Sequence, residues 1–195
     1  TMKKLFKFGM VMLLAISLVG CGSDDSSSDK NDDLLSGNHH AVIDVKDYGV
    51  IKVELNADEA PITVTNFVKL AKDGFYDGLT FHRIINGFMI QGGGYDKDMH
   101  IHETPAIKGE FKSNGIDNPL LHTRGVLSMA RTMIKDSASS QFFIMHEDAP
   151  HLDGEYAAFG KITKGKHVID EIANVPTDAR DCPIEPVVIK TMRLI

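Results

Sequence analysis

The sequence predicts a mainly β domain, a closed or nearly closed antiparallel barrel with two short helices. Many short β-like apolar runs follow one another along the chain, and two further stretches carry helical features. The 195 residues contain 43% hydrophobic and 25% charged residues, the composition of an ordinary globular protein. That length fits one domain with an additional N-terminal segment.

The first predicted elements are two strands and a helix. Residues 40–45 and 49–55 are short β-like runs, the second with a partly polar face. A helix start follows, with Asp58 as the candidate N-cap and Pro61 near the first helical position. Apolar residues then recur three and four positions apart until Gly74, which ends the helix.

The remaining elements are short strands, a second helix and a long irregular segment. The helix is predicted at residues 166–173. Residues 96–124 lack a regular pattern, and a segment of that length in a compact domain is usually a functional loop. The further strands are predicted at residues 79–85, 88–91, 126–130, 141–145, 157–162 and 186–195.

The N-terminal segment has the features of a leader. Three lysines precede the twelve-residue apolar run Phe8–Val19, which is too short to span a bilayer comfortably and has signal-peptide length. The run ends in Leu18-Val19-Gly20-Cys21, which resembles the lipobox of bacterial lipoproteins. We therefore expect residues 1–20 to be a lipoprotein signal peptide and Cys21 to be lipidated, which places the protein outside the cytoplasm on a bacterial membrane.

A polar segment separates this leader from the predicted domain. Residues 22–38 contain five Asp and five Ser with little apolar surface, so they cannot form a core. We expect residues 21–38 to be a disordered acidic and Ser-rich tether, and residues 39–195 to be the globular domain.

Charge and cysteine content limit the partners. Loss of residues 1–20 would leave 18 basic against 27 acidic residues, a net charge of −9. An acidic surface argues against nucleic acid or anionic lipid as the main partner. With Cys21 as the anchor, Cys182 has no second cysteine, so we expect no internal disulfide and interpret Cys182 as an incidental thiol.

Three motifs allow other functions. Residues 92–94 are glycines, but no Lys-Ser/Thr pair follows, which disfavours a phosphate loop. His100 and His102 would be two ligands of a metal-dependent hydrolase, but without HExxH or a Cys/His cluster we expect solvated loop histidines and no metal. No serine lies in a G-x-S-x-G elbow, which disfavours a serine hydrolase.

Three other segments combine polar and apolar residues in a way that a barrel core does not require. They are FHRIINGFMIQGGG from Phe81, GVLSMAR from Gly125, and SSQFFI from Ser139, which is followed by HLDG. Arg83, Ile85, Met89 and Gln91 share a parity, although the intervening Asn-Gly turn can reset it. A core gains nothing from a buried guanidinium, so Arg83 and Gln91 favour a binding or catalytic surface over simple packing.

In this order and spacing, these segments resemble the cyclophilin family of peptidyl-prolyl cis-trans isomerases, from about His40 to Ile195. The resemblance implies a closed eight-stranded antiparallel β-barrel capped by two α-helices. It also implies an enzyme that accelerates rotation about X-Pro bonds and requires no metal, nucleotide or redox cofactor.

The resemblance implies a role for each matching position. Arg83 matches the catalytic arginine, and Gln91 matches the glutamine that helps to orient the arginine and the substrate backbone. The pocket for the proline ring is assigned to Phe88, Met89, Phe143 and Leu152. The rim along which the peptide lies is assigned to Ala130, Arg131 and Gln141.

Three positions depart from the family pattern. His151 stands where the family often has tryptophan, and Tyr156 where it often has histidine, both at the pocket mouth. Because that tryptophan is associated with cyclosporin binding, we expect weak cyclosporin affinity. Arg131 replaces a common asparagine, but the family uses mainly backbone there, so we expect its role to survive.

Isomerisation requires these residue types for a physical reason. Rotation about the planar amide has a barrier of about 18–20 kcal/mol. The imide nitrogen regains a lone pair when the bond twists, so a donor aimed at it stabilises the twisted form selectively. Arg83 offers such a donor and does not lose its proton.

We therefore predict a monomeric, lipid-anchored isomerase that acts on proline-containing peptides and folding proteins outside the cytoplasm. The main alternative is a binding module or chaperone that holds proline-containing segments, with incidental turnover.

Overall fold

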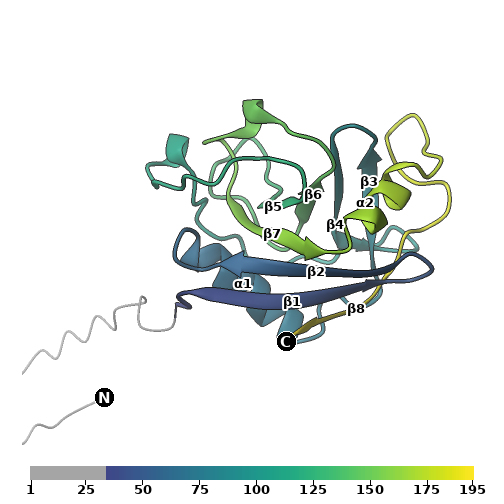
Figure 1. Cartoon of the computed structure of the whole chain (residues 1–195), viewed down its shortest axis with the longest axis horizontal. Helices are drawn as coiled ribbons and strands as arrows, with labels where there is room; N and C mark the ends of the chain where they lie inside the picture. The colour runs from purple at the N-terminus through teal and green to yellow at the C-terminus, as the bar shows by residue number, and fades with distance from the viewer. Residues whose placement is uncertain (1–33) are drawn as a thin grey trace, which may run out of the picture. The chain divides into compact units, whose positions relative to one another are not determined.

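The computed structural model describes residues 34–195 (Figure 1). The predicted leader, Cys21 and most of the predicted tether lie outside the described residues and stay predictions. Within residues 34–195, no helix is both long and apolar enough to cross a membrane.

Eight antiparallel strands make up one sheet that curls into a nearly closed barrel (Figure 1). The strands are β1 (Asn38–Val45), β2 (Gly49–Asn56), β3 (Leu79–Ile85), β4 (Met89–Asp96), β5 (Val126–Met129), β6 (Phe142–Met145), β7 (Ala158–Lys164) and β8 (Ile189–Leu194).

The spatial order of the strands is β3-β4-β6-β5-β7-β2-β1-β8. The two ends of this sheet meet, because Thr80 and Val188 form an antiparallel bridge between the β3 and β8 segments. The backbone N–H of Phe81 also donates to the carbonyl of Val187 over 2.9 Å. These contacts confirm the predicted barrel architecture.

Two helices flank the barrel and fill its ends. Helix α1 (Pro61–Lys72) packs against β2 and β8, whereas α2 (Lys166–Ala173) packs against β2, β3 and β4. The buried face of α1 carries Phe67, whose ring contacts those of Tyr76, Phe142 and Phe159 at centroid distances of 5.1–5.4 Å. Each such aromatic pair contributes about 0.5–1.5 kcal/mol beyond its buried area. Both predicted helices are therefore confirmed, the second with the predicted bounds.

The N-terminus of α1 is capped differently from the prediction. Ala60 occupies the N-cap position without a side-chain hydrogen bond, while Asp58 Oδ1 accepts from the backbone of Gly37. The free backbone N–H groups at the start of the helix instead donate to the buried carboxylate of Glu110, which lies in the loop after β4. It accepts from the N–H of Ile62 at 2.9 Å, and from the N–H and the hydroxyl of Thr63 at 2.7 Å each. Asp58 as the N-cap is therefore wrong.

The ordered domain begins before the predicted boundary at residue 39. The N–H of Leu35 donates to Thr65 Oγ1 over 2.9 Å, and its side chain packs against the barrel core. Asn38 already pairs with Asn56 in the β1–β2 ladder. The last residues of the predicted tether thus belong to the domain, because Leu35 finds apolar surface to bury.

Strand β4 continues through the glycine run to Asp96, although the sequence predicts its end at Gln91. Glycine is required at these positions because neighbouring segments of the same chain leave no room for a Cβ atom. A Cβ atom on Gly92 would lie 2.7 Å from the carbonyl oxygen of Thr80, and one on Gly94 would collide with the side chain of Gln141. The glycines therefore shape the barrel wall.

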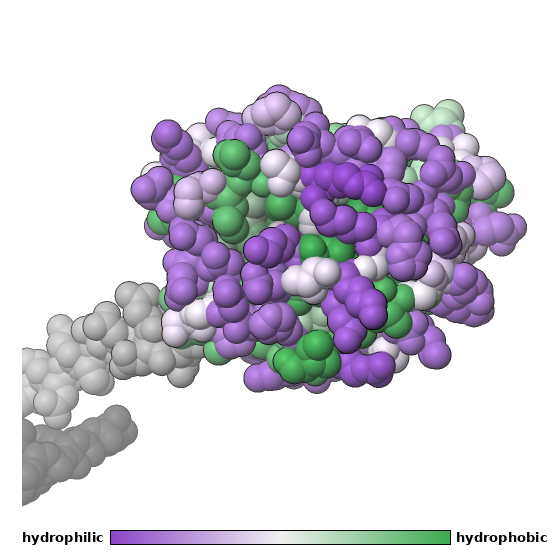
Figure 2. Space-filling model, in the orientation of Figure 1, coloured by the Kyte–Doolittle hydropathy of each residue, from purple (hydrophilic) through white to green (hydrophobic). Residues whose placement is uncertain are grey.

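The segment between β4 and β5 is largely irregular, as predicted for residues 96–124. It contains one short turn of 3-10 helix at Lys112–Asn114, η1, and isolated bridges at Ile101 and Ile107. The face of the molecule in Figure 2 is mainly hydrophilic, with small separate apolar patches. The chain carries a net charge of −6, so this face fits a solvated protein surface.

Candidate active site

A second apolar cluster lies on the face of β4 and β6 opposite the barrel core. It consists of Met89, Phe143, Met145, Ala149 and Leu152. Side chains of a strand alternate between the two faces of a sheet, and the intervening residues Ile90 and Ile144 belong to the main core. The alternation places apolar side chains outside the barrel, where they can bind a ligand.

A hollow of about 160 Å³ lies over this cluster. In the β3–β4 hairpin, Arg83 pairs with Gln91 and Ile85 with Met89, so the four residues of shared parity face the same side. The structure brings together nine of the eleven residues predicted for the site. The hollow is lined by Arg83, Phe88, Met89, Gln91, Ala130, Arg131, Phe143, Leu152 and Tyr156.

Arg83 lies at the wall of the hollow with its side chain 44% exposed. Its Nε atom is 3.6 Å from Asp181 Oδ2, which is an ion-pair distance rather than a hydrogen bond. Asp181 is held in turn because its carbonyl accepts from the N–H of Ile84 over 2.8 Å. The carboxylate can therefore orient the guanidinium without taking its Nε–H in a hydrogen bond.

His82 precedes Arg83 and packs on another surface, where its ring lies 4.6 Å from that of Tyr95. Its Nδ1 atom is buried and has no hydrogen-bond partner among the described residues. Burial, and secondarily the charge of Arg83, lowers the pKa of His82 to about 4. The imidazole is therefore neutral at physiological pH.

We predict that His82 makes the domain less stable in acid. Because its pKa is lower in the folded than in the unfolded state, the unfolded chain binds the proton first as the pH falls below about 6.5. Between pH 7 and pH 4.5, protonation of His82 should lower the free energy of unfolding by about 2 kcal/mol, a value already reduced for the partial exposure of the ring. Urea denaturation at both pH values should show a smaller loss for His82→Gln, and an equal loss in the two proteins would contradict the assignment.

A second hollow of about 310 Å³ adjoins the first and shares Gln91, Ala130 and Arg131 with it. Gln141, the tenth predicted residue, lines this neighbouring space. The Nε2 amide of Gln91 donates to Gln141 Oε1 over 3.0 Å. The hydrogen bond of Gln91 thus goes to Gln141 rather than to Arg83, and the ion pair of Arg83 is with Asp181.

The side chain of Arg131 packs beside the pocket. Its guanidinium lies 4.5 Å from the ring centroid of Tyr156 and 5.0 Å from that of Phe111. It also donates twice to the carbonyl of Glu155, over 2.8 and 3.1 Å. Since the side chain is only 10% exposed, it holds the segment that carries Tyr156 against the pocket.

His151 lies at the edge of the site. Its ring stacks on Phe88, with the centroids 5.7 Å apart and the planes at 27°, but it does not line either hollow. Tyr156 packs edge-on against Phe143 at 5.9 Å. His151 and Tyr156, which depart from the expected pattern, therefore each contact an aromatic residue of the pocket.

Comparison with known proteins shows to which family this chain belongs. The family model for cyclophilin type peptidyl-prolyl cis-trans isomerases matches residues 40–194. The chain belongs to the cyclophilin family of peptidyl-prolyl cis-trans isomerases. As a cyclophilin-type isomerase, it catalyses cis-trans isomerisation of X-Pro bonds.

Bacterial and protozoan proteins resemble this cyclophilin over most of its length. It is 45% identical to peptidyl-prolyl cis-trans isomerase A of Dickeya dadantii over 157 residues, covering 75% of this chain and 80% of the relative. It is 40% identical to isomerase B of Escherichia coli, covering 74% and 93%. A crystal structure of a Cryptosporidium parvum cyclophilin matches with a TM-score of 0.69 and 30% identity, covering 82% and 98%.

A buried polar network that the sequence analysis missed supports the cyclophilin pocket. His122 Nδ1 lies 3.0 Å from Asp153 Oδ1, and its Nε2 lies 2.9 Å from Ser128 Oγ. These are the residue types of a hydrolytic triad, but Ser128 is fully buried, so no substrate reaches its hydroxyl. Burial lowers the pKa of His122 against the opposing effect of Asp153.

The network has a structural use next to the pocket. The ring of His122 stacks with Phe143 at 6.1 Å, and the carboxylate of Asp153 also accepts from the backbone N–H of His122 over 2.7 Å. Asp153 directly follows Leu152 in the chain, so its hydrogen bonds to His122 also hold Leu152 in place at the pocket. The sequence carries no short motif for this arrangement, because the partners His122 and Asp153 are 31 residues apart.

Proposed function

We propose that Arg83 catalyses X-Pro rotation in this cyclophilin by stabilising the twisted amide over the 160 Å³ hollow, and that the enzyme acts on proteins folding outside the cytoplasm. One observation carries the catalytic part of the proposal. Arg83 lines the same hollow as the apolar residues Phe88, Met89, Phe143 and Leu152.

The hollow suits a proline ring. Its aromatic and aliphatic lining removes apolar substrate surface from water, which contributes about 25 cal/mol per Å² buried. One of the related Cryptosporidium parvum cyclophilin structures was obtained in the presence of the dipeptide Ala-Pro; it is 31% identical and has a TM-score of 0.68. These observations support proline-containing peptides as the substrate class.

Catalysis then follows from selective binding of the half-rotated state. With the ring held in the hollow, the rest of the peptide turns about the imide bond. The nitrogen becomes pyramidal and gains a lone pair, to which Arg83 donates. Each 1.4 kcal/mol by which this donation favours the twisted over the planar amide raises the rate about tenfold.

Exchange NMR on a short Ala-Pro peptide tests the catalytic proposal. We expect catalytic amounts of the purified protein to accelerate cis-trans exchange. Saturable peptide binding without acceleration would instead support the alternative of a proline-binding module or chaperone.

The extracytoplasmic location is supported by the lysines, apolar run and Gly20-Cys21 junction of the N-terminal sequence, and by the acidic segment that follows. Metabolic labelling with a fatty acid analogue tests this part. We expect label in the membrane fraction for the wild type and none for Cys21→Ser. Unlabelled wild-type protein in the cytosol would refute the location and leave the enzymatic mechanism unaffected.

We predict weak cyclosporin binding, because the imidazole of His151 offers less apolar area than an indole over Phe88. Calorimetric titration should give a dissociation constant above the submicromolar range for the wild type. His151→Trp should bind at least about tenfold more tightly. Submicromolar affinity of the wild type, or no gain in the variant, would contradict this explanation.

A further inference from the structure

A tight hairpin at the end of β4 presents four metal-binding side chains at alternate positions. Tyr95 and Ile101 form an antiparallel bridge, and the N–H of His102 donates to the carbonyl of Gly94 over 2.8 Å. The hairpin runs Asp96-Lys97-Asp98-Met99-His100-Ile101-His102, so two carboxylates and two imidazoles recur at every second residue.

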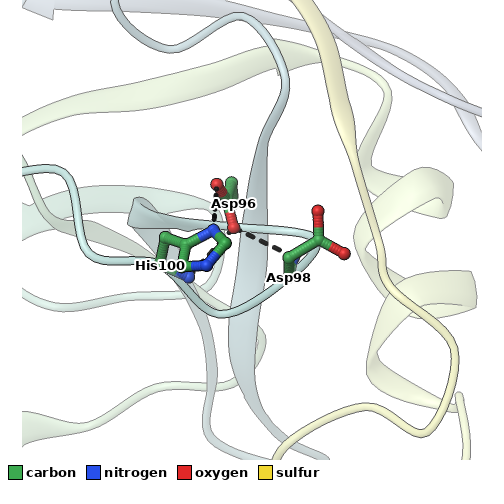
Figure 3. Close-up of side chains that lie close together, drawn as sticks. All are labelled: Asp96, Asp98 and His100. Carbon is green, nitrogen blue, oxygen red and sulfur yellow. Dashed lines mark hydrogen bonds and ion pairs between the residues drawn. The ribbon is translucent and has the colours of Figure 1, made fainter.

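The hairpin brings both imidazoles to one carboxylate oxygen of Asp96. Asp96 Oδ2 lies 3.3 Å from His100 Nδ1 and 3.3 Å from His102 Nε2. Ligand atoms of Asp96, Asp98 and His100 all lie within 4.8 Å of one another, and Figure 3 shows these three side chains together. Three different residues therefore converge within the reach of a single cation, and His102 contacts the same central oxygen.

The other oxygen of Asp96 fixes this arrangement. Asp96 Oδ1 accepts from the backbone N–H of Asp98 over 2.9 Å and of His100 over 3.0 Å. The carboxylate is therefore held with Oδ2 toward the imidazoles, as hydrogen-bonded metal ligands are.

The two contacts of Asp96 Oδ2 also have the spacing of neighbouring ligand atoms on one cation. A charge-assisted N–H···O bond is about 2.7–2.9 Å long, shorter than the two contacts of 3.3 Å. Ligand bonds of 2.0–2.1 Å around tetrahedral zinc place neighbouring donor atoms about 3.3–3.4 Å apart. The contacts of Asp96 Oδ2 with the two rings match this spacing.

We propose that the Asp96–His102 hairpin binds one divalent transition-metal ion of the zinc class, with Asp96, Asp98 and His100 as its ligands. Asp98 Oδ2 pairs with Lys97 Nζ over 2.7 Å, and the ion would replace this pair. His102, which contacts the same oxygen of Asp96, is a further donor beside the ion. Imidazole donors favour Zn²⁺ and similar ions over Mg²⁺ or Ca²⁺, which prefer oxygen ligands. The sequence alone favours solvated histidines here, because it does not show that the hairpin brings His100 and His102 to Asp96. The proposal is independent of the isomerase mechanism.

Calorimetric titration of the full chain with ZnCl₂ at pH 7.5 tests the site. We expect saturable one-to-one binding of micromolar affinity that persists in excess Mg²⁺. His100→Gln/His102→Gln should weaken binding at least about tenfold. His100 is 75% exposed and its side chain bonds only to Asp96 among the described residues, so the fold should survive.

His39→Gln/His40→Gln is the matched control, since it removes two imidazoles from β1 and should leave zinc binding unchanged. Thermal melts of both double variants establish that they are folded. Histidine Cε1–H resonances of His100 and His102 should shift on zinc addition, with those of His39 and His40 unmoved. Absence of saturable binding, or binding retained in His100→Gln/His102→Gln, would overturn the proposal.

Discussion

Replacing Arg83 by alanine should lower the catalysed exchange rate of an Ala-Pro peptide by about 10²–10³, the usual effect of losing one donor to a transition state. Peptide affinity should change much less, because the apolar hollow that holds the proline ring remains. Exchange NMR measures both quantities in one sample. A fall in rate with retained binding is expected only if the guanidinium acts on the twisted amide.

Arg180→Ala is the matched control for this experiment. Arg180 is 89% exposed, pairs with Asp178 and lies in the same loop as Asp181, but it does not line the hollow. Its loss should leave the rate unchanged. Equal losses of the catalysed exchange rate in the two variants would mean that the overall positive charge, and not the position of Arg83, determines the rate. An unaltered rate in Arg83→Ala would refute the mechanism.

Replacing Glu110 by glutamine should lower the free energy of unfolding by about 2–4 kcal/mol. The carboxylate of Glu110 is 2% exposed and accepts three hydrogen bonds at the start of α1. A glutamine of the same shape loses the charge that favours the helix N-terminus and turns an amide toward backbone donors. Urea denaturation at pH 7 measures the change.

Asp58→Asn provides the comparison, because Asp58 is the cap that the sequence predicts. Its Oδ1 accepts from Gly37, and an asparagine oxygen can do the same, so we expect a change within about 0.5 kcal/mol. If Asp58→Asn were the more damaging substitution, the assignment of the cap to Glu110 would be wrong.

The fold was predictable because its signals are local. Val64, Phe67 and Val68 carry the helical spacing of α1, and the short apolar runs mark the strands within a few residues. The end of β4 was harder to predict, since glycines such as Gly92 resemble a strand break when only the sequence is considered. Only the neighbouring carbonyl of Thr80 explains why no side chain fits there.

Most residues of the candidate site were also predictable, but through resemblance to a family rather than from physics alone. Strand parity suggested a common face for Arg83, Met89 and Gln91 without that help, but the intervening Asn-Gly turn left this open, and the register of the hairpin decides it. The supports of the site were not predictable, because Glu110 and His122 act through partners distant in the chain. A lone buried glutamate or histidine has no periodic pattern that reveals its partner.

The pairing of β1 affects the order in which the barrel becomes complete. Strand β1 lies between β2 and β8, and the N–H of Ile195 donates to the carbonyl of His40 over 3.0 Å. One edge of β1 is therefore completed only by β8, a strand from the other end of the described residues. Until β8 is in place, that edge is unpaired and open to strands of other chains.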